Sequence, residues 1–151
     1  MFMIVVDYPS EDEECAIVSR TTSGESPAVA TVLTAGELLA MQDLVRQMPI
    51  ADHVIRYAVR LARQTRKGQP DTPPLVRDFV TWGAGPRAAQ HLILGAKARA
   101  ILHGESCVAT EDVRAVACPV LRHRIITNFR AESEQIKPDN IIQQLVERMP
   151  T

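Results

Sequence analysis

The sequence predicts an all-α fold, a bundle of about six helices with a short strand stub at its N-terminus. Apolar residues recur at helical spacing in several segments, and residues that favour helix starts precede most of these segments. One run, MFMIVVDYPS at residues 1–10, is instead typical of a buried strand. The length of 151 residues and the hydrophobic content of 46% suit one domain with a real core.

The N-terminal strand has no later partner of equal quality in the sequence. A lone buried strand needs a sheet, so we expect residues 1–9 to be the remnant of a sheet formed by other residues. Residues 10–151 then form the helical domain. Because the side chains of the stub are apolar, we expect it to lie against helices, to be disordered, or to pair with another chain, and not to build its own sheet.

Two capping boxes predict the first two helices. Ser10 with Glu13 opens one, and Thr34 with Glu37 opens the other. Residues 21–30, TTSGESPAVA, have the composition of a flexible connection between them. Apolar residues at helical spacing then predict a core-facing side that ends before a proline: Leu38, Met41, Val45 and Met48.

The next helix is predicted from about residue 51 to residue 67, and it has two distinct sides. One side is apolar and is expected to face the core: Ile55, Ala58, Val59 and Ala62. The other carries a basic stripe: Arg56, Arg60, Arg63 and Arg66. Such a stripe is either a solvated face or a surface for phosphates or acidic partners. Residues 67–74 break the helical pattern and lead into a loop that carries a short helix or turn.

A long helix is predicted from Pro86 to about His103, because glycine is accepted at an N-cap and proline at the first helical position. Gly104 suits the left-handed position after its end. The first turn of this helix contains Arg87, although a cation there costs about 0.3–1 kcal/mol unless an anion joins it. Two interpretations remain open: Arg87 pairs with an acidic side chain of a neighbouring helix, or it binds a phosphate together with helix N–H groups.

The C-terminal third predicts two further helices. Thr110 is expected to cap one that begins at Glu111 and is broken or restarted near Pro119. LRHRIITNF, residues 121–129, is compatible with a short extended segment. Pro138 opens the last helix. Its apolar side is formed by Ile141, Ile142, Leu145, Val146 and Met149.

The sequence lacks the motifs of nucleotide hydrolysis, of nucleophilic catalysis and of metal binding. The 151 residues contain no G-x-x-x-x-G-K-[ST] phosphate loop, and MIVVD resembles a Walker B strand only in part, since Tyr8 stands where a glutamate is expected. Ser106 has no nucleophile-elbow motif around it, and His103 with Cys107 makes only half of a metal site. The other histidines are scattered: His53, His91 and His123. We therefore expect no metal.

The composition of the chain indicates its cellular location and the classes of partner that it does not favour. The cysteines Cys15, Cys107 and Cys118 are odd in number and form no C-x-x-C pair, which suits a reducing compartment. No apolar run approaches the roughly 18 residues of a membrane span, and the N-terminus lacks a basic region and a cleavage site. We expect a cytoplasmic location. A net charge of −1 and an aromatic content of 4% argue against nucleic acid and membrane surfaces as partners.

Two stretches together resemble the C-terminal part of MoxR-type AAA+ ATPases. They are IVVDYPSEDEE at residues 4–14 and TWGAGPRAAQHLILGAKARAILHGESCVATEDVRAVACPVLRHRI at residues 81–125. The resemblance spans nearly the whole chain and is weakest in residues 21–33 and 67–75. It implies a helical lid of AAA+ type in residues 10–151, with residues 1–9 as the remnant of the last AAA+ core strand.

The resemblance also implies a function for Arg87, which aligns with the sensor 2 arginine that contacts ATP phosphate. Gly85 stands where the family usually has serine, a difference that affects the cap and leaves the arginine in place. The family has its phosphate loop, Walker B element, sensor 1 and arginine finger upstream, so we assign no catalytic residue here and expect no ATP hydrolysis by this chain alone. In the full-length protein the resemblance implies ATP and Mg²⁺, a hexameric ring, chaperone-like remodelling of protein complexes, and a von Willebrand A domain partner.

Two functions without a nucleotide remain as alternatives. A DNA-binding helical module would use the basic stripe against phosphates, which the balanced net charge disfavours. A protein-interaction module would use apolar surface that the missing core leaves exposed.

Overall fold

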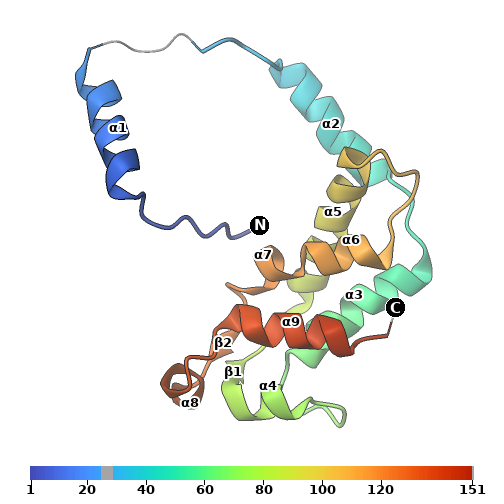
Figure 1. Cartoon of the computed structure of the whole chain (residues 1–151). Coiled ribbons are helices and arrows are strands. Elements are labelled where there is room, and N and C mark those ends of the chain that lie inside the picture. Colours follow the sequence, from blue (N-terminus) through green and yellow to red (C-terminus); the bar gives the residue numbers. More distant parts are fainter. Residues whose placement is uncertain (25–28, 151) are drawn as a thin grey trace.

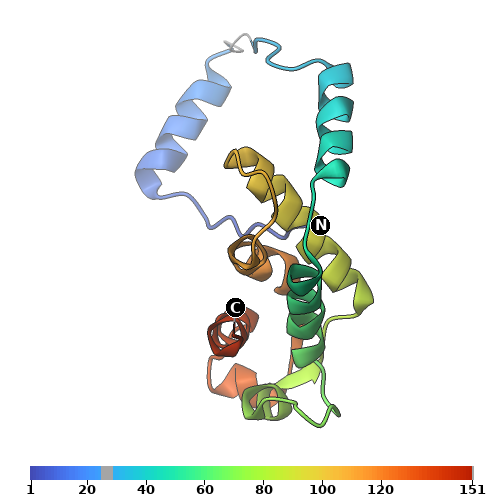
Figure 2. The ribbon, with the colours of Figure 1, turned by 90° about the vertical axis from the view of Figure 1, so that its right-hand side faces the viewer.

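The computed structural model describes residues 1–24 and 29–150, and in these residues it contains nine helices and one two-stranded sheet (Figure 1). The predicted all-α fold is therefore confirmed. A compact body begins at Met48, while residues 1–47, here called the N-terminal arm, contain no buried residue in their described part and extend away from the body through α1 and most of α2 (Figures 1 and 2). The predicted flexible connection at 21–30 falls partly on residues 25–28, which lie outside the described residues.

The N-terminal arm contains α1 (Glu11–Thr22) and α2 (Ala35–Gln47), and both capping boxes are confirmed. The Ser10 amide donates to Glu13 Oε2 at 2.8 Å, and the Thr34 amide donates to Glu37 Oε2 at 2.8 Å. The expectation of a buried face on α2 is wrong, because Leu38 is 50% and Met41 48% exposed. Val45 is half-buried, and Met48 is the only residue of the predicted face that is buried. Met48 follows the last residue of α2. The apolar face of α2 therefore lies open.

Residues 1–9 are extended and take part in no sheet of the described chain, as predicted. Their first three residues lie against α5 (Pro86–Leu102) and α7 (Ala117–Leu121). The Met3 amide donates to the Pro119 carbonyl at 2.8 Å, and Arg122 Nη1 donates to the Met3 carbonyl at 3.3 Å. The Phe2 ring sits on Gly95, where a Cβ atom would lie 2.8 Å from ring carbons. The start of the arm is thus docked on the body.

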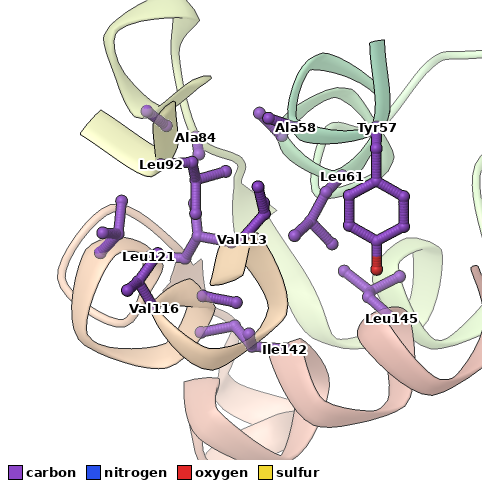
Figure 3. Close-up of a cluster of buried hydrophobic side chains, with 14 of the residues drawn as sticks. Tyr57, Ala58, Leu61, Ala84, Leu92, Val113, Val116, Leu121, Ile142 and Leu145 are labelled. Atoms are coloured by element: carbon purple, nitrogen blue, oxygen red, sulfur yellow. The ribbon is translucent and has the colours of Figure 1, made fainter. Parts of the chain in front are cut away.

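In the compact body α3 (Asp52–Gln64), α6 (Thr110–Ala115) and α7 pack against α5, and α9 (Pro138–Arg148) packs against α7 and α3. The buried side chains of these helices point toward one another (Figure 3). The C-terminal helix buries the side predicted for it, including Ile141, Ile142 and Leu145. The inward face of α3 was predicted only in part, because Ile55 and Val59 are 37% and 41% exposed. The residues that α3 buries are Val54, Tyr57, Ala58, Leu61 and Ala62.

Short elements close the end of the body at which α5 begins. They are α4 (Pro74–Phe79), β1 (Val80–Trp82), β2 (Ile126–Thr127) and α8 (Phe129–Ser133). The strands are antiparallel, with Val80 opposite Thr127 and Trp82 opposite Ile126. The predicted short helix after residue 67 and the extended segment within residues 121–129 are confirmed, whereas β1 and α8 were not anticipated. The sheet holds the chain that leads from α4 into α5.

The predicted cap at Thr110 is wrong by one residue. The helix α6 begins at Thr110 itself, and Ala109 is its N-cap residue. Alanine offers no side-chain acceptor, so the start of α6 relies on Asp112, whose Oδ2 accepts a hydrogen bond from the Ala109 amide at 2.9 Å. The break between α6 and α7 falls at Val116, and Pro119 lies within the first turn of α7.

Candidate functional site

The start of α5 matches its prediction. Gly85 is the N-cap residue with extended backbone angles, φ −74° and ψ 178°, and Pro86 is the first helical residue. Arg87 follows in the first turn, and its side chain is exposed. Since the unpaired N–H groups make this helix end partly positive, the guanidinium of Arg87 adds to a positive potential instead of offsetting it.

Within the residues that the structure describes, no acidic side chain forms an ion pair with Arg87. In residues 1–24 and 29–150 the ion pairs are Arg99–Asp112, Arg122–Asp139 and Arg130–Glu134. The interpretation of Arg87 as half of an ion pair with a neighbouring helix thus finds no partner within the described chain. A cation and a helix N-terminus together form a place where an added anion is stabilised.

The helix behind Arg87 is firmly anchored. Ala88, the next residue, is fully buried, and the buried face continues along α5 through Leu92, Ala96 and Ala100. Three of the four side chains are methyl groups, which lets neighbouring helices approach α5 closely. The first turn of α5 is therefore directly joined to the part of the helix that is buried in the core.

The loop before α5 is held by the end of α3. Thr65 is fully buried, and its Oγ1 donates to the Ala62 carbonyl at 2.7 Å and accepts from the Ala84 amide at 2.8 Å. The carbonyl of Ala84 is also held, because it accepts a hydrogen bond from Arg66 Nε at 2.8 Å. Both peptide units that flank Ala84 are thus fixed by residues that follow directly after α3.

Gly83 permits this close contact. A Cβ atom at position 83 would lie 2.2 Å from the Thr65 carbonyl oxygen and 2.8 Å from the Arg66 Cα. Both obstacles are backbone atoms, which do not rotate away as a side chain would. Only glycine therefore lets the loop pass the end of α3 at this distance. An open hollow of about 360 Å³ lies beside the contact, between Arg66 and residues 81–86, and Trp82 at its edge is 70% exposed.

One turn beyond Arg87, α5 carries His91, which sequence analysis did not link to the site. Its Nδ1 is buried and has no hydrogen-bond partner in the described residues. Burial, together with the positive charges of Arg124, the amino terminus and Arg87, lowers the pKa of His91. The i, i+4 spacing of Arg87 and His91 was the available signal, since it places both on one face of the helix.

The basic stripe of α3 is divided. Arg56 and Arg60 are exposed, whereas Arg66 turns toward the loop before α5. Arg63 Nη2 donates to Gln69 Oε1 at 2.8 Å, so its guanidinium contacts the connection that follows α3. The four arginines therefore do not form one continuous outward surface.

The remaining candidates stay apart. His103 Nδ1 lies 2.9 Å from the Arg99 carbonyl of its own helix, and the described residues contain no group of three or more side chains suited to a metal ion. The three cysteines have free thiols, and Asp7 and Tyr8 are exposed in the extended N-terminal segment. Within the described part of the chain, no helix combines the length and the apolar character needed to cross a membrane.

Comparison with known proteins gives consistent matches. Residues 74–145 match the family model of the AAA lid domain. Chaperone MoxR1 of Mycobacterium tuberculosis is 32% identical over 148 residues, which are 97% of this chain and 39% of that protein. Protein MoxR of Paracoccus denitrificans is 51% identical over 47 residues, 31% of this chain and 14% of that protein.

A solved structure from Cytophaga hutchinsonii, described as a candidate ATPase, matches with a TM-score of 0.85 and 26% identity over 99% of this chain and 46% of that one. The chain therefore spans less than half the length of each of these relatives. The structural match includes the N-terminal arm as well as the body. Residues 74–145 are an AAA lid domain, within a chain that is homologous to the MoxR chaperones.

Proposed function

We propose that this chain acts as the lid of a MoxR-like AAA+ ATPase and that Arg87 is its sensor 2 arginine, which contacts a phosphate of ATP. The observation that carries the proposal is the exposed Arg87 guanidinium at the N-terminus of α5, with no ion-pair partner in the described chain. A bound phosphate would supply the counter-charge that both the guanidinium and the helix end favour.

The cap of α5 supports the same proposal. Gly85 has no side chain, so no side-chain hydrogen bond closes the N-terminus of the helix. A serine at this position would accept a hydrogen bond from an amide of the first turn. With glycine, the Arg87 amide is left for solvent or for an anionic ligand, whereas Pro86 has no N–H and the Ala88 amide donates to the Gly85 carbonyl. Glycine in place of the family's usual serine therefore removes a hydroxyl that would compete with phosphate for a first-turn N–H group. The arginine itself is kept.

The exposed N-terminal arm provides the surface for an AAA+ core. Leu38, Leu39, Met41 and Leu44 of α2 are each about half exposed or more, and so are most apolar residues of the extended segment 1–8. Apolar surface of this extent needs a covering partner. We assign that partner as the AAA+ core domain, which would also supply the phosphate loop and the Mg²⁺ ligands that these 151 residues lack. We call the combination of this lid and its core the assembled ATPase.

In the assembled ATPase the lid would convert a phosphate contact into movement. The contact at Arg87 acts on α5, whose buried face forms the centre of the body, so the lid would move as one unit when the phosphate is gained or lost. From the MoxR resemblance we further propose a hexameric ring, chaperone-like remodelling of protein complexes, a von Willebrand A domain partner and a cytoplasmic location. The DNA-binding alternative is weakened because Arg63 and Arg66 are engaged within the fold.

Steady-state ATP hydrolysis by the assembled ATPase tests the proposal. Arg87→Ala should lower kcat/KM for ATP by about 10- to 100-fold, the range expected for loss of one charge-assisted hydrogen bond of about 1.5–3 kcal/mol. Arg87→Lys should recover only part of the rate, because lysine keeps the charge but not the planar set of donors. Arg56→Ala, which removes an exposed arginine of α3, is the matched control and should retain the wild-type rate. Wild-type kinetics in Arg87→Ala would refute the proposal.

A further inference from the structure

The peptide groups on both sides of Ala84 are held from the end of α3, three residues before Arg87. The Ala84 amide donates to Thr65 Oγ1 and its carbonyl accepts from Arg66 Nε, each at 2.8 Å. Two hydrogen bonds on opposite sides of one residue fix its backbone more strictly than either does alone, since they leave neither adjacent peptide plane free to rotate.

The chain between this contact and Arg87 has little freedom of its own. Pro86 has a φ angle restricted by its ring, and the Ala88 amide donates to the Gly85 carbonyl at 3.0 Å, which closes the first turn of α5. Gly85 is the one link with backbone freedom, and its carbonyl is held by the Ala88 amide, so the position of Ala84 constrains that of Arg87. Gly83 completes the arrangement, because any side chain there would collide with the Thr65 backbone.

Thr65 is itself fixed in one arrangement. Its side chain is fully buried and its hydroxyl hydrogen is used on the Ala62 carbonyl of α3 at 2.7 Å, which leaves the oxygen lone pairs directed at the loop. The hydroxyl therefore links the last turn of α3 to the loop before α5. The Arg66 carbonyl lies 3.1 Å from Thr72 Oγ1, whose single hydroxyl hydrogen it shares with the Gln69 carbonyl at 2.8 Å.

We propose that Thr65 and Arg66 are positioning residues for Arg87, which by their hydrogen bonds to Ala84 set where its guanidinium meets phosphate. The inference rests on the proposed sensor 2 function of Arg87 and adds the residues that orient it. Neither side chain needs to touch the nucleotide. A displacement of the Arg87 guanidinium by about 1 Å is enough to cost a large part of its effect on the reaction.

The test is a double-mutant cycle in the assembled ATPase. Thr65→Val removes the hydroxyl at nearly unchanged volume, and it should lower kcat/KM for ATP by about 10-fold or more. The double variant Thr65→Val/Arg87→Ala should be no slower than Arg87→Ala within about twofold, because Thr65 acts through Arg87. Thr65→Ser restores the hydroxyl and should recover the rate to within about threefold of wild type.

Two controls separate positioning from general stability. Leu145→Ala opens a cavity in the core at α9 and should reduce the melting temperature while leaving kcat/KM near wild type. Arg66→Gln alters a half-buried side chain and removes the guanidinium that binds the Ala84 carbonyl, so it gives a second test if Thr65→Val folds poorly. In the 151-residue chain, either positioning variant should speed hydrogen exchange of the amides of residues 84, 85, 87 and 88 more than that of other amides.

The outcomes distinguish the two proposals. If Arg87→Ala lowers the rate but Thr65→Val and Arg66→Gln do not, or if the losses in the double variant multiply, the positioning inference is wrong and the sensor 2 proposal stands. The inference also fails if Leu145→Ala reproduces the loss seen with Thr65→Val. If Arg87→Ala retains the wild-type rate, the sensor 2 proposal is wrong and the positioning inference falls with it.

Discussion

Arg99 of α5 and Asp112 of α6 form an ion pair in which Nη1 and Oδ1 are 2.6 Å apart. The Asp112 side chain is only 5% exposed, and its other oxygen accepts a hydrogen bond from the Ala109 amide at 2.9 Å. One carboxylate thus joins two helices and also caps the start of α6. The Arg99 side chain is 34% exposed and so remains partly in contact with water.

Asp112→Ala should destabilise the chain by about 1.5–3 kcal/mol, the range for losing hydrogen bonds to a charged group. Thr110→Ala should cost less than about 1 kcal/mol, because the Thr110 hydroxyl contacts Glu111 Oε2 at 3.2 Å and caps no helix amide. Free energies of unfolding from urea titrations of both variants provide the comparison. A larger loss for Thr110→Ala than for Asp112→Ala would mean that Thr110 is the cap after all.

The N-terminal arm should contribute to association and not to the stability of the body. Leu38→Ser and Leu44→Ser change side chains that are 50% and 51% exposed, so each should alter the free energy of unfolding by no more than about 0.5 kcal/mol. Leu92→Ala, at a fully buried position of α5, should cost about 2–5 kcal/mol in the same measurement.

The arm variants should nevertheless weaken binding of this chain to a separately prepared AAA+ core, as measured by calorimetry, since they remove apolar surface that the core would cover. Core binding at wild-type strength by the double variant Leu38→Ser/Leu44→Ser would show that the open face of α2 has another role.

Local patterns predicted the helices well where the controlling contacts are local. The capping boxes at Ser10 and Thr34 and the Gly85–Pro86 helix start depend on residues within a few positions of one another, and the structure confirms each of them. Apolar spacing on α2 predicted a buried face, and this prediction is wrong for the described chain, because spacing does not reveal which residues are available to cover a face. Leu38 and Met41 are therefore exposed despite a regular pattern.

Long-range contacts explain what the sequence did not predict. The cap of α6 depends on the Asp112 carboxylate, which is buried and paired with Arg99, thirteen residues away. The hydrogen bond from Ala84 to Thr65 spans nineteen residues, and no motif marks either partner. The candidate site was predicted at Arg87 because the helix start around it is local, whereas the residues that hold its loop became visible only in the fold.

The stability of the chain should fall as the pH is lowered below about 6.5, the ordinary pKa of histidine. Burial, with nearby positive charge, lowers the pKa of His91 in the folded chain. Between this lowered value and about 6.5 the unfolded chain binds more protons, so the stabilisation is complete above this window and is lost through it as the pH falls. Unfolding free energies at pH about 7.5 and about 5.5 should differ less in His91→Gln than in wild type. Equal differences would show that His91 does not carry the effect.

The purified 151-residue chain should not hydrolyse ATP, because it contains no G-x-x-x-x-G-K-[ST] phosphate loop. Phosphate release from ATP and Mg²⁺ should therefore equal that of a buffer control and should not change in the Arg87→Ala chain. Turnover that copurifies with the chain and persists in Arg87→Ala would indicate a contaminant. Turnover that rises in proportion to the chain and depends on Arg87 would contradict the assignment of this chain as a lid.

The equilibrium affinity of the assembled ATPase for ATP, measured for wild type and Arg87→Ala beside the melting temperature of the 151-residue chain carrying the same change, tests the central claim most directly. Because Arg87 is exposed and the phosphate proposed for it would come from outside the chain, the substitution should leave the melting temperature nearly unchanged or slightly raised. The affinity should fall by about 10- to 100-fold, as expected when one charge-assisted contact to phosphate is lost. Wild-type affinity in Arg87→Ala, or a chain that unfolds on this substitution, would show that Arg87 is a structural residue and would contradict the account.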